Sequence, residues 1–190
     1  MEKESEKKQE EKAFVETLKK EQVVTTALQK LHRKPFSISV YRHVSLVEAL
    51  EAELCSIEEA IPQLDESKKA EAQKRRDELN VELAKLEADK IEGVLTPLTY
   101  RDINDIKAAI TEAVVHFQEY KFDMDVTMAR VAAEERYMTV FCVLKSTTDT
   151  SKRYFATLED VAAIDEATIY LLYNRWEQHF VLTDTELKNL

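Results

Sequence analysis

Histidine and cysteine, which bind transition metals, are few in this 190-residue sequence, and their spacing does not suit a metal site. A helical zinc site needs two histidines one turn apart on the same helix face. The histidines here are scattered: His32, His43, His116 and His179. Asp123 and Asp125 match the first positions of a calcium loop, but Thr127 and Met128 stand where an acid or amide and then glycine are needed. We expect no metal, and a helix start at the two aspartates.

Nucleophilic and acid–base catalysis have equally little support. Cys55 and Cys142 are far apart, and Cys55 lies in a heptad pattern with no neighbouring histidine. We expect both thiols to be buried in a reducing compartment. The adjacent acids at 58–59 and 134–135 point in different directions on a helix, so solvated surface explains them best. The sequence predicts no catalytic residue and no cofactor, and a hydrolase with unmarked carboxylates is only the third functional hypothesis.

Composition predicts long helices, because one glycine and three prolines leave few means of making tight turns. A single glycine also cannot form a phosphate-binding loop. The net charge of −10 disfavours nonspecific nucleic-acid binding but is compatible with DNA mimicry toward a basic protein. The sequence has a charged amino terminus unlike a signal peptide and no apolar run of about 18 residues. We expect a cytoplasmic protein without membrane contact.

The amino-terminal part combines a tail, a helix and a strand. Residues 1–12 are almost all charged or polar and predict a disordered tail. In the segment 13–44, apolar residues at helical spacing predict a helix that ends before Pro35. Alternation of apolar and polar residues then indicates a strand over 35–42. This strand lies alone along the helices or pairs with a second extended segment, for which 153–157 is the candidate.

Residues 45–92 predict a charged helical hairpin. Ser45 and Glu48 form a capping-box pattern, and Asp65 caps a second helix after a proline break. The apolar positions form a narrow coiled-coil seam, which comprises Val47, Leu50, Leu54, Ile57, Leu79, Leu83 and Leu86. Gly93 fits the left-handed residue that ends the second helix. We expect the hairpin to project into solvent, either as an arm for self-association or client binding or as a solubilising appendage.

Residues 93–190 predict an acidic, aromatic-rich helical body. Capping patterns at Thr99 and Thr157 start two of its helices. The segment 125–144 favours one long buried helix, with a strand at 138–144 as the alternative. Six aromatic residues, spaced to lie near one another, either pack in the core or bind a partner: Tyr170, Tyr173, Trp176, Phe180, Tyr137 and Phe141. The predicted fold class is mainly α, a helical bundle with a projecting antiparallel helical hairpin and one or two short strands.

The order of these elements resembles a family. The strand SISVYR is followed by LTPLTYRDINDIKAAI, EERYMTVFCVLK and YFATLEDVAAIDEATIYLLYNRWEQHFVLTDTELKNL. This resembles the tail assembly chaperones of tailed bacteriophages over roughly residues 36–190. The likeness rests on the capped helix rich in Tyr and Trp and the LTDTELKNL that follows it, whereas the hairpin at 46–92 looks like an insertion.

The resemblance implies a non-enzymatic assembly chaperone. Such proteins bind the long tape measure protein, keep its apolar helices soluble and help to recruit tail tube subunits, and they have no catalytic residues. We therefore expect protein partners of this kind, in the cytoplasm of a bacterial host. The alternative hypothesis is an acidic inhibitor or DNA mimic that occupies a basic groove of a host or defence protein.

Overall fold

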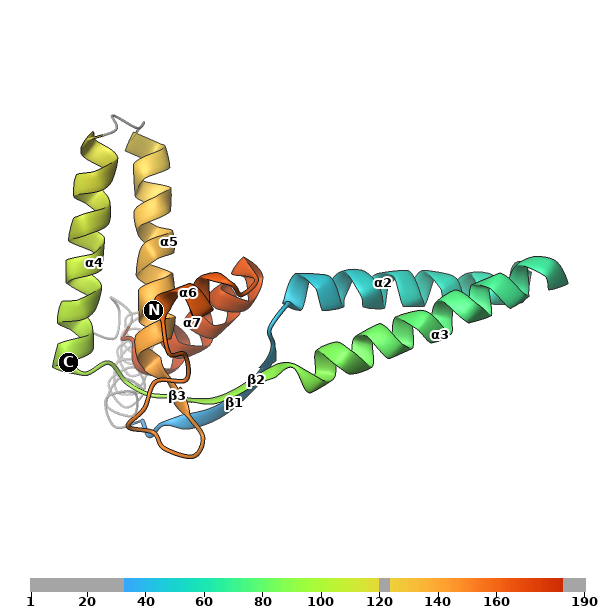
Figure 1. Cartoon of the computed structure of the whole chain (residues 1–190), viewed down its shortest axis with the longest axis horizontal. Coiled ribbons are helices and arrows are strands. Elements are labelled where there is room, and N and C mark those ends of the chain that lie inside the picture. Colours follow the sequence, from blue (N-terminus) through green and yellow to red (C-terminus); the bar gives the residue numbers. More distant parts are fainter. Residues whose placement is uncertain (1–32, 120–123, 183–190) are drawn as a thin grey trace, which may run out of the picture. The chain divides into compact units, whose positions relative to one another are not determined.

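The computed structural model describes residues 33–119 and 124–182 of the chain (Figure 1). The chain divides into two compact units, one formed by Pro35–Asn174 and the other by residues 1–34 with 175–190. Several predicted features lie outside the described residues, namely the tail and helix before residue 33, His32, Asp123 and the last capped turn at 183–186. Among the described helices, none combines the length and apolarity that a membrane crossing requires.

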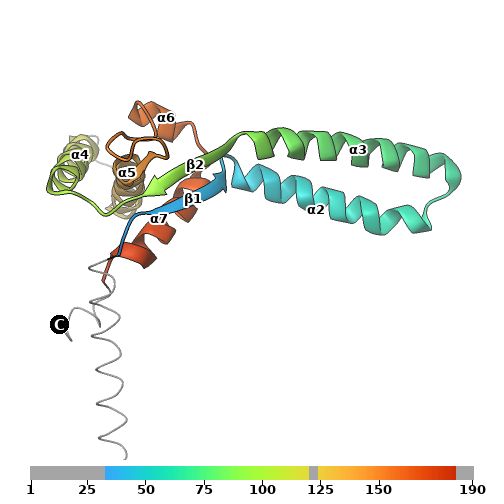
Figure 2. The same cartoon turned by 90° about the horizontal axis from the view of Figure 1, so that it is seen from below.

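The predicted mainly α fold is confirmed. Two helical hairpins make up most of the larger unit. The first consists of α2 (Val44–Ala60), a 3-10 turn (Ile61–Gln63) and α3 (Glu66–Ala88). The second consists of α4 (Tyr100–Glu119) and α5 (Met124–Val143), which lie side by side in both views (Figures 1 and 2). Two further helices follow, α6 (Leu158–Ala162) and α7 (Glu166–Phe180).

A small antiparallel sheet joins these helices. Its strands are β1 (Phe36–Tyr41), β2 (Lys90–Leu95) and β3 (Leu144–Ser146), in the order β1-β2-β3. The first strand was predicted, and its partner is β2 rather than the segment 153–157. That segment adjoins β3 instead, through a bridge between Arg153 and Lys145 and a bond from the Tyr154 amide to the Leu144 carbonyl. In the chain, β1 is followed by α2, and α3 is followed by β2. The paired strands therefore connect the first helical hairpin to the sheet (Figure 2).

Gly93 is not a helix cap, and this prediction was wrong. Helix α3 ends at Ala88, and Gly93 lies in the middle of β2, opposite Ile38 on β1 and Ser146 on β3. A β-carbon at this position would stand 2.7 Å from Leu144 Cδ1 and 3.1 Å from the Lys145 carbonyl oxygen. Leu144 is fully buried and has no free space to move into. The glycine is therefore required by close packing of β2 against β3 and not by backbone conformation.

The start of α2 also differs from the prediction. His43 precedes the helix without a side-chain cap, so the predicted capping box of Ser45 and Glu48 does not form. The free amides of the first turn are bonded by residues from α7 and its entry. The Val44 amide donates to Thr168 Oγ1 at 3.1 Å, and the Ser45 amide donates to Asp165 Oδ2 at 2.7 Å. A tertiary contact thus replaces the local cap.

The carboxy-terminal helix is interrupted, whereas one continuous helix was predicted. The capping box of Thr157 and Asp160 forms as predicted and starts α6, which ends at Ala162. Asp165 then begins α7, since its carboxylate accepts from the Ala167 amide at 3.1 Å. In contrast, the long helix predicted over 125–144 forms and ends at Val143, and Leu144 begins β3, so the alternative strand at 138–144 is not formed. Residues 138–144 are all buried and are apolar except Thr139, and such a run resembles a strand in sequence.

Substitution of Gly93 tests the close packing of the sheet. We expect Gly93→Ala to lower the free energy of unfolding by about 1–3 kcal/mol, the usual cost of overpacking a buried site. The cost should shrink in a Leu144→Ala background, because the truncated side chain no longer meets the new methyl group. Urea unfolding of the four proteins measures this coupling. An equal cost in both backgrounds would contradict the proposed clash.

Replacement of Asp165 tests the tertiary cap. Hydrogen bonds from Ser45 hold the pKa of the Asp165 carboxyl below its ordinary value. Its stabilisation is therefore complete above the unfolded-state pKa of about 3.9 and is lost as pH falls through the folded-state pKa. We expect Asp165→Ala to cost about 1 kcal/mol at neutral pH, with the deficit shrinking below about pH 4. Urea unfolding across this pH range measures it, and Glu159→Ala on the exposed side of α6 is the control. A deficit independent of pH would refute the ionic cap.

Candidate functional site

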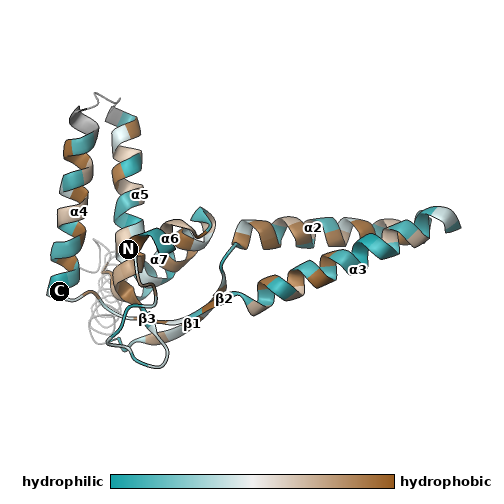
Figure 3. Ribbon diagram, in the orientation of Figure 1, coloured by the Kyte–Doolittle hydropathy of each residue, from teal (hydrophilic) through white to brown (hydrophobic). Residues whose placement is uncertain are grey.

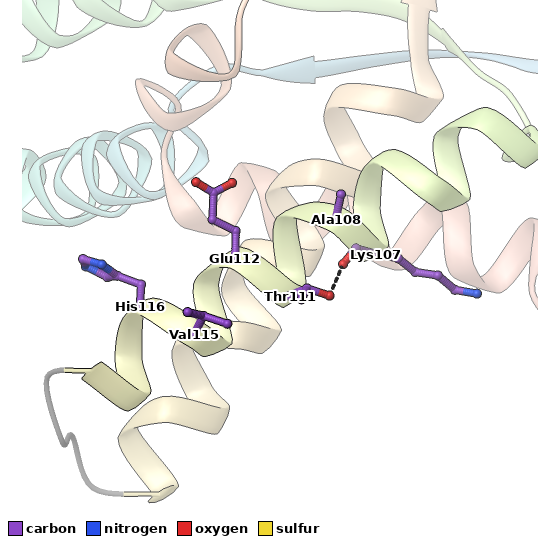
Figure 4. A pocket seen from close by; sticks show the side chains of 6 residues that line it. All are labelled: Lys107, Ala108, Thr111, Glu112, Val115 and His116. Atoms are coloured by element: carbon purple, nitrogen blue, oxygen red, sulfur yellow. Dashed lines mark hydrogen bonds between the residues drawn. The ribbon is translucent and has the colours of Figure 1, made fainter.

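A shallow groove lies on the outer side of α4. It has a volume of about 650 Å³ and is lined by residues from three successive turns: Lys107, Ala108, Thr111, Glu112, Val115 and His116 (Figure 4). We call it the α4 groove. All six side chains are exposed, and Val115 keeps 50% of its surface accessible although it is aliphatic. The Thr111 hydroxyl donates to the Lys107 carbonyl at 2.8 Å, which turns its methyl group toward the open side of the helix.

Two local features place the α4 groove on the outside. The cap of Thr99 and Asp102 fixes the start of α4, because the Thr99 amide donates to Asp102 Oδ2 at 3.0 Å and the Asp102 amide donates to Thr99 Oγ1 at 3.2 Å. Ile106 is buried at 7% exposure and Ile110 is half-buried, on the side that packs against α5. The apolar stripe of α4 therefore faces α5, while Ala108 and Val115 lie off that stripe.

Sequence reasoning missed the α4 groove. The predicted apolar face of this helix was used to identify its core side, and Val115 was overlooked beside the half-buried Val114. The available signal was the second apolar and small-residue row, Ala108, Thr111 and Val115, flanked by Lys107 and Glu112. Small residues between opposite charges allow another helix to approach closely. The groove is therefore shaped for a helix and offers no buried polar group for chemistry.

Acids and a cysteine do meet at the base of α4. Ligand atoms of Asp102, Asp105 and Cys142 lie within 4.8 Å of one another. However, Arg153 Nη2 lies 3.0 Å from Asp105 Oδ2 and 3.7 Å from Asp102 Oδ1, so a guanidinium already neutralises the acids. Its carbon also stands 4.4 Å from the ring centre of Phe141. The geometry is that of a structural ion network between α4, α5 and the segment after β3.

The pKa shifts in this network support the structural interpretation. Burial raises the pKa of the Cys142 thiol to about 11, so the sulfur is a neutral thiol at physiological pH and a poor ligand or nucleophile. Burial alone would raise the pKa of the Asp102 carboxyl, but hydrogen bonds from Thr99 and the nearby charges of Lys145 and Arg153 hold it below its ordinary value. The carboxylate stays charged and bonded, which stabilises the start of α4.

The seam of the first helical hairpin is partly as predicted. Val47, Leu50 and Leu79 are buried, whereas the other predicted seam residues are half-buried: Leu54, Ile57, Leu83 and Leu86. Arg75, which interrupts the seam, reaches across to Glu53 on α2 in a bidentate pair of 2.8 and 3.0 Å. Cys55 is exposed, in contrast to the predicted burial, because its position on α2 faces away from α3.

The outer side of α3 carries a second groove. It has a volume of about 700 Å³ and is lined by exposed residues, of which Val81 is the only aliphatic one larger than alanine: Ala70, Gln73, Lys74, Asp77, Glu78, Val81, Glu82 and Lys85. We call it the α3 groove. Figure 3 shows that α3 is mostly hydrophilic, in keeping with a single apolar seam. Val81 lies off the seam at 56% exposure, and no residue of α3 was predicted to bind a partner through this side.

The six aromatic residues predicted as core or partner-binding residues differ in burial. In the larger unit, Phe141 is buried at 9% exposure, Tyr137 and Tyr173 are half-buried, and Tyr170 is 53% exposed. The Arg136 guanidinium carbon stands 5.5 Å from the ring centre of Tyr170. Trp176 and Phe180 belong to the smaller unit, where Trp176 is buried at 7% exposure. The rings of Phe180 and His179 meet edge to face, with their centres 4.6 Å apart. Tyr170 is thus the most accessible of the six.

Comparisons with protein-family models, curated proteins and solved structures give no match for this chain. Its function is therefore inferred from its own residues.

The two thiols provide a test of the ion network. In native protein near pH 8, we expect the exposed Cys55 to react with an aromatic disulfide reagent, although the charge of Glu59 raises the pKa of its thiol and slows the reaction. A Cys55→Ser chain should react very slowly until it is unfolded, because with a pKa of about 11 only roughly one Cys142 thiol in a thousand is ionised at that pH. Absorbance of the released thiolate measures both rates. A fast reaction of native Cys55→Ser protein would contradict the buried, neutral thiol.

Proposed function

We propose that this chain is a non-enzymatic assembly chaperone or adaptor that binds amphipathic helices of a client protein in the α4 groove. The single observation that supports this function is the exposed row of Ala108, Thr111 and Val115 on a helix whose other apolar side is already packed. A solvent-exposed apolar row on a rigid helix is typical of helix-in-groove recognition. The client helix would cover Val115 and lie between Lys107 and Glu112.

The resemblance to tail assembly chaperones suggests the client. A tape measure protein consists largely of long apolar helices that need protection before assembly, and the tail tube subunits are recruited to it. Binding by shape and apolar contact suits a client with many similar helical segments, since the α4 groove offers little that reads a particular sequence. On this proposal the chain acts in the cytoplasm of a bacterial host, and its net charge of −10 keeps the complex soluble.

One observation favours the alternative, an acidic inhibitor or DNA mimic. Helix α2 carries five glutamates and no basic residue, and only Glu53 among them has a described ion pair. The other four are exposed: Glu48, Glu51, Glu58 and Glu59. On α3, by contrast, acids alternate with basic partners, such as Lys74 with Glu78 at 3.9 Å. Within the first hairpin, the continuous negative surface is thus confined to α2, so this alternative has less support than the chaperone.

A groove-filling substitution tests the chaperone function. We expect Thr111→Arg to block the α4 groove with a long charged side chain while leaving α4 folded, because arginine is the better helix former at an exposed site. Co-expression with the tape measure protein encoded by the same genome, followed by size-exclusion chromatography, measures the soluble complex. Wild type should keep the tape measure protein soluble, and Thr111→Arg should lose most of it, about a tenfold reduction or more.

The control places the same side chain on another helix. Ser56 on α2 is exposed and lies outside the α4 groove, so Ser56→Arg should behave like wild type. Absence of a complex with tape measure or tail tube protein, or equal binding by Thr111→Arg, would refute the proposal. A complex that forms with a basic host protein, dissociates at about 0.5 M salt and fails with Glu58→Lys would support the DNA mimic instead.

A further inference from the structure

The charges of α3 are separated along its length. Residues 66–76 contain five basic and two acidic side chains, a net charge of +3, while residues 77–88 contain four acidic and one basic, a net charge of −3. The neighbouring helix α2 is acidic throughout. The basic half of α3 in one molecule can therefore attract the acidic half of α3 in another molecule. An antiparallel pair of α3 helices opposes the basic half of each to the acidic half of the other, whereas a parallel pair opposes like charges.

The α3 groove lies across the boundary between these halves. Its accessible aliphatic residue, Val81, is 56% exposed and is flanked by Lys74 one to two turns earlier and by Glu82. The side chain of Lys74 is 80% exposed, and its described ion pair with Glu78 is long at 3.9 Å. Both its aliphatic stem and its charge are thus available to a partner. The groove is about 700 Å³ and open, which suits a helix better than a small molecule.

We propose that the α3 groove is an interface between two copies of this chain, in which the two α3 helices pack antiparallel about a two-fold axis at the level of Asp77 and Glu78. In this register Lys74 of one copy lies at the level of Val81 and Glu82 of the second copy. Its stem covers Val81 and its ammonium group pairs with Glu82, and the two-fold axis repeats both contacts. The two hairpins then form one layer of four helices, with the two α3 helices in the middle and the hairpin loops at opposite ends.

The acids next to the axis do not oppose this arrangement. Asp77 and Glu78 of one copy lie close to the same two residues of the other copy, but each already forms an ion pair with an arginine of its own helix. Arg76 Nη2 lies 3.0 Å from Asp77 Oδ1, and Arg75 Nη1 lies 3.7 Å from Glu78 Oε2. The contact is small and rich in exposed charges, so we expect a weak dimer in the micromolar range that dissociates as salt is added.

Charge reversal at the paired positions tests the interface. Lys74→Glu faces glutamate and Glu82→Lys faces lysine in the proposed register, so each should weaken the dimer by roughly tenfold or more. The double variant Lys74→Glu with Glu82→Lys restores opposite charges at both contacts and should dimerise like wild type. Sedimentation of the purified full-length chain, from low to high micromolar concentration and at low and high salt, measures the dissociation constants. Circular dichroism confirms that each variant is folded.

Two controls separate this interface from other effects. Glu51→Lys also reverses an exposed charge of the hairpin but lies on α2, outside the α3 groove, so it should leave the dimer unchanged. Thr111→Arg in the α4 groove should also leave it unchanged, so client binding and dimerisation can fail independently. A monomer at all concentrations, single reversals without effect, or a double variant as weak as the single ones would each overturn the proposed dimer. Dimerisation that occurs only when a client is added would show that the client occupies the α3 groove.

Discussion

The antiparallel pairing of β1 with β2 is the constraint on which the rest of the larger unit depends. In the sequence, β1 precedes α2 and β2 follows α3. Their pairing therefore holds the two ends of the first helical hairpin together and fixes which sides of these helices meet. β2 also pairs with β3, which follows α5 directly. One six-residue strand therefore ties both helical hairpins to the same sheet. The close approach of Gly93 to Leu144 makes this double pairing sterically feasible.

Contacts between distant segments support this sheet at each point where a helix leaves it. Asp165 and Thr168 bond the first amides of α2, and the Thr168 hydroxyl also donates to the carbonyls of Tyr41 and Arg42. At the far side, the Thr96 amide and hydroxyl both donate to the Val143 carbonyl. A short sheet has few ladder bonds of its own, so these polar contacts determine where each strand ends.

The sequence allowed prediction of the features that depend on local patterns. Helical periodicity and the caps at Asp65, Thr99 and Thr157 were enough to place the starts of α3, α4 and α6, because a cap bonds its own first turn. β2 was missed because KIEGVL follows a helix without a turn residue, and its glycine is equally typical of a helix end. The true cap of α2 comes from residues about 120 positions away, which no local pattern indicates. The α4 groove needed knowledge of which apolar row α5 covers.

The two grooves differ in chemistry because packing leaves different kinds of residue exposed on α4 and on α3. α4 uses its strongly apolar stripe against α5, and what remains outside is a second row of small and aliphatic residues with two flanking charges. α3 has one narrow seam, and what remains outside is charge around a single valine. An apolar row tolerates many helical ligands, whereas a charge pattern of opposite halves fits best with its own copy in reverse. On the proposed function, client binding and self-association use surfaces on different helices, so neither competes with the other.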